Sequence, residues 1–156
     1  MSSFTDFSAP LCIQYDQEAS KAIGADHWRV REGFRFYIGS PDSGDWVNVP
    51  AGYLTDGASV PRLFWSLIPP WGIYGQAAVV HDIVCEYLSI TKEGTPFRVS
   101  RKVCDDILLQ AMEVIGVPLI TRHAIHKAVA LYRIASGVNA PTTTPIKRQL
   151  EANWSI

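Results

Sequence analysis

The sequence predicts an α+β domain in which a small antiparallel sheet with an N-terminal β-hairpin comes first, a loop-rich segment follows, and three helices form the C-terminal half. Three observations predict this order. Aromatic and β-branched residues alternate with polar residues between 28 and 49, glycine and proline are frequent between 50 and 72, and apolar residues recur every three or four positions between 74 and 137. Strands that precede helices argue against alternating βαβ units and a parallel sheet.

Length and composition limit the classes of protein to consider. A chain of 156 residues with 47% hydrophobic and 19% charged residues is typical of one globular domain. We divide it into an N-terminal arm at 1–26, a single α+β domain at 27–137 and a C-terminal tail at 138–156. The formal net charge of −1 provides no basic surface for a nucleic acid. No stretch has the pattern of a secretory signal or of a transmembrane segment, so we expect synthesis in a host cytoplasm.

The strands are predicted from an alternation of period two. Phe34 and Phe36 alternate with Arg35 and Tyr37, which is typical of a half-buried strand. Residues 39–44 (GSPDSG) form a turn cluster, after which strand character resumes up to residue 49. We therefore predict a hairpin over residues 34–49.

The loop-rich segment contains three dense turn clusters, at 50–52, 55–61 and 69–72. Between them, the apolar residues 63–68 are too few for an independent helix, and we expect them to form a buried turn. This segment is placed where it would line a cleft above the first C-terminal helix. The residues predicted to line the cleft are Asp56, Gly57, Trp71 and Gly72.

The three helices follow from apolar stripes and from residues that favour helix ends. The first is predicted over 74–88. The second begins after Ser100, a favourable N-cap, and stops before Gly116. The third is capped by Thr121 and ends at Gly137.

The polar residues of the first two helices predict the site. His81 lies at the edge of a buried stripe, and its neighbour Asp82 points about 100° away. On the second helix, the residues three, four and seven positions after Asp105 are all apolar. Burying a carboxylate without a partner is costly, and the nearest candidate partner in a helical hairpin is His81.

A histidine oriented by a buried carboxylate has the properties of a general base. Asp82 would then be available to bind a hard cation such as Ca²⁺. The same residues also permit a structural interpretation, in which a His81–Asp105 hydrogen bond only ties two helices together. A zinc site at His81 and Cys85 lacks an identifiable fourth ligand, and the odd number of cysteines, three without a CxxC spacing, favours free buried thiols.

Four segments resemble DUF1353, a family of unknown function that is common in bacteriophages. They are residues 49–62 (VPAGYLTDGASVPR), 69–72 (PPWG), 77–82 (AAVVHD) and 100–112 (SRKVCDDILLQAM). The resemblance extends roughly from Trp28 to Tyr132, and its motifs occur in order at consistent spacing. It implies a phage or prophage origin, and it implies no activity.

The His-Asp pair is also similar, more distantly, to that of phospholipases A2, in which an Asp on a neighbouring helix faces the pair. The similarity implies that His81 is the base, Asp105 the orienting acid and Asp82 a Ca²⁺ ligand, with lipid esters as substrates. This chain departs from the pattern because Cys85 follows the pair where a tyrosine is usual, and because it has no Gly-rich calcium loop of the usual form.

Two functions follow as expectations. The first is a phage-encoded, Ca²⁺-dependent hydrolase with a phospholipase A2-like site. The second is a non-catalytic structural or assembly protein of the virion, associated with the tail or tail tip, whose partners are other virion proteins. The second interpretation predicts a sealed His81, and the first predicts an open cleft above it.

Overall fold

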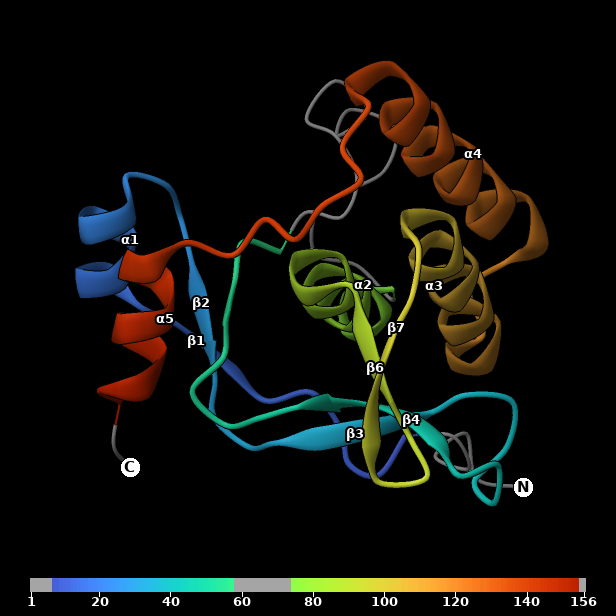
Figure 1. Ribbon diagram of the computed structural model, residues 1–156, viewed down its shortest axis with the longest axis horizontal. Coiled ribbons are helices and arrows are strands. Elements are labelled where there is room, and N and C mark those ends of the chain that lie inside the picture. The colour runs from blue at the N-terminus through green and yellow to red at the C-terminus, as the bar shows by residue number, and fades with distance from the viewer. Residues whose placement is uncertain (1–6, 58–73, 155–156) are drawn as a thin grey trace.

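The computed structural model describes residues 7–57 and 74–154, which fold as an α+β protein with two small antiparallel sheets (Figure 1). The predicted fold class is confirmed, with strands concentrated in the N-terminal half and helices in the C-terminal half. In chain order the elements are β1 (Ile13–Tyr15), α1 (Gln17–Ile23), β2 (Trp28–Val30), β3 (Phe34–Tyr37), β4 (Asp45–Val49), β5 (Leu54–Thr55), α2 (Gly75–Tyr87), β6 (Ser89–Lys92), β7 (Thr95–Arg98), α3 (Arg101–Ile115), α4 (Leu119–Ser136) and α5 (Pro145–Ala152).

The predicted hairpin is present as β3 and β4. Phe34 pairs with Val49 and Phe36 with Val47, all four of them buried, so one face of the hairpin supplies the core. A second hairpin, β6–β7, adds to the free edge of β4 and gives a four-stranded sheet in the order β3-β4-β6-β7. The other sheet has the order β1-β2-β5.

Helix α2 lies at the centre of the molecule, between the sheets and α3 (Figure 1). Ten of its 13 residues are buried, because β4, β5 and β6 cover one side and α3 the other. Helix α4 packs on the far side of α3. Any polar side chain on α2 must therefore find a partner within the protein.

The helix ends mostly follow the predicted signals. Ser100 caps α3 by accepting a hydrogen bond from the backbone N–H of Val103, and Gly116 ends this helix in the left-handed conformation. The predicted cap at Thr121 is wrong, because α4 starts at Leu119 and its N-cap is Pro118, three residues before Thr121. Gly137 ends α4 as predicted.

Several elements were not predicted. They are α1, α5 and the strands β1, β5, β6 and β7. Helix α1 has only seven residues, and the strand β7 is exposed along its whole length. Helix α5 lies in the segment interpreted as a tail, and it packs beside α1 (Figure 1). The buried turn expected at 63–68 lies outside the described residues.

Close packing of α5 depends on a glycine in the turn before β5. Gly52 has a φ of +93°, and a Cβ atom there would lie 2.9 Å from Cε3 of Trp154, just beyond the end of α5. A side chain at this position would therefore strain the backbone and also push Trp154 away.

We predict that Gly52→Ala lowers the free energy of unfolding by about 1–3 kcal/mol more than Gly24→Ala does. Gly24 is the matched control, because its φ is +91° but a Cβ atom there meets nothing within 4 Å. Urea denaturation of both variants measures the difference. Equal losses would mean that Trp154 does not pack against Gly52 in solution.

Candidate functional site

The central helix α2 carries two pairs of polar residues with four-residue spacing, and each pair faces a different side. His81 and Cys85 point toward α3, while Asp82 and Glu86 interact with residues of the β5 region and α5. Adjacent residues on a helix point about 100° apart, which separates the two pairs. The site therefore consists of two polar clusters on either side of one helix.

The first cluster is centred on Asp105, which has two partners. Its Oδ1 atom lies 2.7 Å from Nε2 of His81, and its Oδ2 atom accepts a hydrogen bond of 2.7 Å from Nη1 of Arg133. His81 is 4% exposed and Asp105 is 1% exposed, so the pair is sealed from solvent. The contact that was predicted between His81 and Asp105 is thus present, and it links α2, α3 and α4.

Arg133 was not identified as a site residue in the sequence analysis. The signal that could have indicated it is the charge requirement of Asp105: a buried carboxylate that faces a neutral histidine still carries a net charge. No local pattern identifies which of the arginines supplies that charge, because Arg133 lies 28 residues away.

The environment of His81 favours its protonated form. Burial disfavours the imidazolium ion, but the neighbouring Cys85 and the Asp105 carboxylate favour it more strongly and raise its pKa from 6.5 to about 9. The Cys85 sulfur lies 3.2 Å from the same Nε2 atom, and its pKa is raised far above its usual range by a hydrogen bond with Cys104 and by burial.

His81, Cys85 and Asp105 offer three ligand atoms within 4.8 Å of one another. A transition metal there would need the thiolate form of Cys85, and the raised pKa of that thiol opposes it. Asp105 already has two protein partners as well. The described residues thus provide a self-satisfied hydrogen-bonded cluster at this position.

The second cluster begins with Asp82, which is partly buried beside β5. Its Oδ2 atom accepts a hydrogen bond of 2.8 Å from Oγ1 of Thr55. Burial and the nearby carboxylate of Asp56 raise the pKa of Asp82 from 3.8 to about 7, although Lys147 and Thr55 act in the opposite direction. Two carboxylates and a hydroxyl oxygen therefore lie together, which is the type of donor set that hard cations prefer.

The cluster continues to Glu86, whose partner comes from α5. Lys147 donates to Oε1 of Glu86, and its Nζ atom lies 3.6 Å from Oε2 of Glu151. Tyr53 also donates to Oε1 of Glu86, at 3.1 Å, and its ring lies 4.3 Å from the Lys147 ammonium. Sequence analysis missed this cluster because Lys147 falls in the segment interpreted as a tail.

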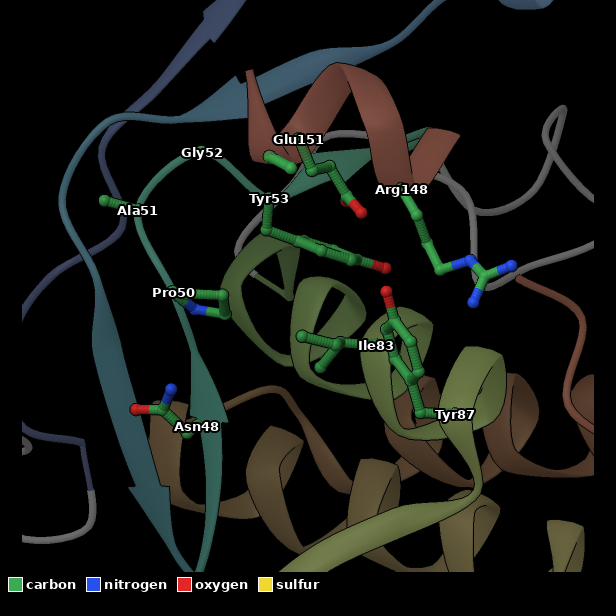
Figure 2. A pocket seen from close by; sticks show the side chains of 10 residues that line it. Asn48, Pro50, Ala51, Gly52, Tyr53, Ile83, Tyr87, Arg148 and Glu151 are labelled. Atoms are coloured by element: carbon green, nitrogen blue, oxygen red, sulfur yellow. The ribbon is translucent and has the colours of Figure 1, made fainter. Parts of the chain in front are cut away.

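A pocket of about 510 Å³ opens beside this second cluster (Figure 2). The hydroxyl groups of Tyr53 and Tyr87 point toward each other across it, and Glu151 and Arg148 enter from α5. This volume is in the range of small-ligand sites. The residues that line it are Asn48, Pro50, Ala51, Gly52, Tyr53, Ile83, Tyr87, Arg148, Glu151 and Ala152.

The predicted cleft residues are only partly described. Asp56 lies near Asp82, and Gly57, with a φ of +75°, donates its N–H to Oγ1 of Thr55 at 3.2 Å. Trp71 and Gly72 lie outside the described residues. None of the described helices is long and apolar enough to cross a membrane.

Comparisons with known proteins identify a family. The family described as "Protein of unknown function (DUF1353)" matches residues 28–129, which is more than half of the chain. The uncharacterized protein y4jT of Sinorhizobium fredii (strain NBRC 101917 / NGR234) is 37% identical over 99 residues, which cover 62% of this chain and 26% of that protein. The matched region thus spans about a quarter of this relative's length, and no solved structure matches the chain.

The raised pKa of His81 predicts how stability depends on pH. Because the folded-state pKa is about 9 and the unfolded value is 6.5, the stabilisation is fully present below about pH 6.5 and is lost as the pH rises through 9. We expect the stability difference between the wild type and His81→Gln to shrink over this interval by up to about 3 kcal/mol.

Urea denaturation at pH 6, 7.5 and 9 measures this difference. The control is His123→Gln, which removes an exposed imidazole from α4 and should leave the stability close to that of the wild type. A difference between wild type and His81→Gln that stays constant with pH would contradict the ion pair with Asp105.

Proposed function

Since the chain belongs to the DUF1353 family, whose function is unknown, we propose that it is a small phage-encoded hydrolase domain with a phospholipase A2-like site. In this proposal His81 is the general base, Asp105 orients it, Asp82 binds Ca²⁺, and the substrates are lipid esters. The observation that carries the proposal is the 2.7 Å contact between Nε2 of His81 and Asp105.

Because Asp105 contacts Nε2, the other ring nitrogen of His81, Nδ1, is the atom that could act as the base. Asp105 is held in turn by Arg133, so the orientation of the imidazole is fixed from both sides. Among residues 7–57 and 74–154, no group forms a hydrogen bond with Nδ1. Because His81 is 4% exposed and not in an open cleft, catalysis would require the protein to open and admit water and the ester to Nδ1. A neutral His81 would then accept a proton there from water while that water's oxygen attacks the ester carbonyl, and the proton would pass to the leaving alkoxide.

The oxygen atoms around Asp82 favour the binding of a hard cation. Asp82 and Asp56 are the residues that would hold it, because their carboxylates lie close enough to raise the pKa of Asp82. When bound, Ca²⁺ would supply positive charge for the carbonyl oxygen of the substrate.

The pocket beside Asp82 supports an apolar substrate group. Ile83, the next residue of α2, lines it together with Pro50 and the two tyrosine rings. Such a surface offers apolar contact to an acyl chain, while Arg148 and Glu151 of the same pocket offer charged groups to a polar head group. This is the basis for proposing lipid esters as substrates.

One observation favours a second candidate, a non-catalytic structural protein of the virion tail. His81 is 4% exposed and bridges three helices through Asp105, which is what a structural tie requires. An apolar face of α4 also remains uncovered, as expected for a chain that assembles with other proteins. Its exposed apolar residues are Leu119, Ile120, Leu131, Tyr132 and Ile134.

We predict that wild-type protein binds Ca²⁺, that Asp82→Asn weakens the binding at least about tenfold, and that His81→Gln leaves it unchanged. Isothermal titration calorimetry on folded variants measures the three affinities. Folded wild type that binds no Ca²⁺, or binding that survives unchanged in Asp82→Asn, would exclude Asp82 as a calcium ligand.

We further predict that hydrolysis of phosphatidylcholine vesicles in the presence of Ca²⁺ increases with pH up to about 9, because the His81 imidazolium cannot accept a proton. His81→Gln should lower the rate at least about 100-fold, and His123→Gln should not change it. A release of fatty acid that is equal in the wild type and His81→Gln, or absent in both, would leave the structural role as the better account.

A further inference from the structure

Helix α5 is docked on the protein by a charged residue. Lys147 is the buried residue of this helix, at 9% exposure, while Ile146 beside it is 46% exposed. In a helix that packs through an apolar face, the isoleucine would be buried and the lysine exposed. The contact of α5 with Glu86 of α2 is therefore an electrostatic one, made by the ammonium group of Lys147.

The ammonium group of Lys147 lies in a cluster of carboxylates. Glu86 accepts from its Nζ atom, Glu151 lies 3.6 Å away, and Asp82 is close enough for its charge to raise the pKa of Lys147. Two carboxylates, those of Glu86 and Glu151, thus contact the ammonium ion, and Asp82 lies one helical turn before Glu86 on α2. The charge of Asp56 in turn acts on Asp82.

One carboxylate oxygen in the cluster has no partner. Oε2 of Glu86 is buried and forms no hydrogen bond among the described residues, although the residue is only 6% exposed. A buried, unpaired carboxylate oxygen costs free energy unless a donor or a cation satisfies it. The ammonium group of Lys147 contacts Oε1 and therefore leaves the cluster incompletely satisfied.

We propose that Asp82, Glu86 and Glu151 form a site for a hard divalent cation, and that the Lys147 ammonium occupies this site as an internal counter-ion until a metal ion displaces it. The inference rests on the proposed calcium role of Asp82 and adds its regulation. Carboxylate oxygens are the ligands that Ca²⁺ prefers, and a divalent ion would also satisfy the second oxygen of Glu86.

Displacement of Lys147 would leave α5 attached to the protein. Glu151 accepts from the N–H of Leu54 at 2.9 Å, Arg29 donates to the carbonyl of Leu150 at 3.1 Å, and Trp154 packs against Gly52. A cation held by Asp82 and Glu86 of α2 and by Glu151 of α5 would bridge the two helices in place of Lys147. Since Arg148, Glu151 and Ala152 form one wall of the pocket, the cation would fix the position of this wall in the proposal (Figure 2).

The test compares Ca²⁺ affinity, by calorimetry, in the wild type and in Lys147→Gln and Lys127→Gln. Lys147→Gln removes the competing charge but retains a donor for Glu86, and Lys127→Gln removes an exposed charge from α4, which packs on α3. We expect Lys147→Gln to bind Ca²⁺ at least about tenfold more tightly than the wild type, and Lys127→Gln to bind like the wild type. Hydrogen exchange of residues 145–152 in the wild type should slow when Ca²⁺ is added, because the cation would tie α5 to α2.

The outcomes separate this inference from the proposed function. Equal affinities of the wild type and Lys147→Gln, with unchanged exchange in α5, would overturn the role of Lys147 while leaving calcium binding at Asp82 intact. Binding by Lys147→Gln alone would mean that Ca²⁺ does not displace Lys147 in the wild type, and it would overturn both the displacement and calcium use by the wild type. Absence of binding in all three folded proteins would overturn both.

Discussion

The carboxylate of Asp105 is the constraint on which the C-terminal half of this protein depends. It is 1% exposed, and its two oxygens bind His81 on α2 and Arg133 on α4. Breaking a buried charged pair by removing one partner costs about 3–5 kcal/mol, a large share of the stability of a single domain. The relative positions of three helices are thus linked through one side chain, since any shift that separates either pair leaves a buried charge.

Helix α2 shows how a fully surrounded helix accommodates polar residues. Apolar residues such as Val80 and Val84 fill the core, and the polar residues come in pairs four positions apart, so that each pair faces one neighbouring element. The His81 side is satisfied by α3 and α4. The Asp82 side is satisfied by β5 and α5, with Lys147 as the buried cation. The two sides therefore use different chemistry although they belong to one helix.

Local signals made part of this arrangement predictable. The hairpin of β3 and β4, the limits of α3 and the contact of His81 with Asp105 follow from period, capping and the cost of a lone buried acid. Lys147 could not be predicted in the same way, because it lies 61 residues from Glu86, and a lysine in a polar segment usually faces solvent. Arg133 was missed for the same reason. The sequence therefore indicated where a charge was needed but not which residue provides it.

The two sides of α2 also differ in how a ligand could reach them. His81 is enclosed by partners that cannot leave without exposing Asp105, so the same contacts that stabilise the helices restrict access to the imidazole. The Asp82 side is covered by α5, whose only buried residue is a lysine, and that helix also forms a wall of the pocket. Another cation can take the place of an ammonium group beside carboxylates, whereas a cation cannot take the place of an apolar side chain in a hydrophobic contact. Of the two sides, the one bearing Asp82 is therefore the side through which a metal ion and a substrate would first meet the protein.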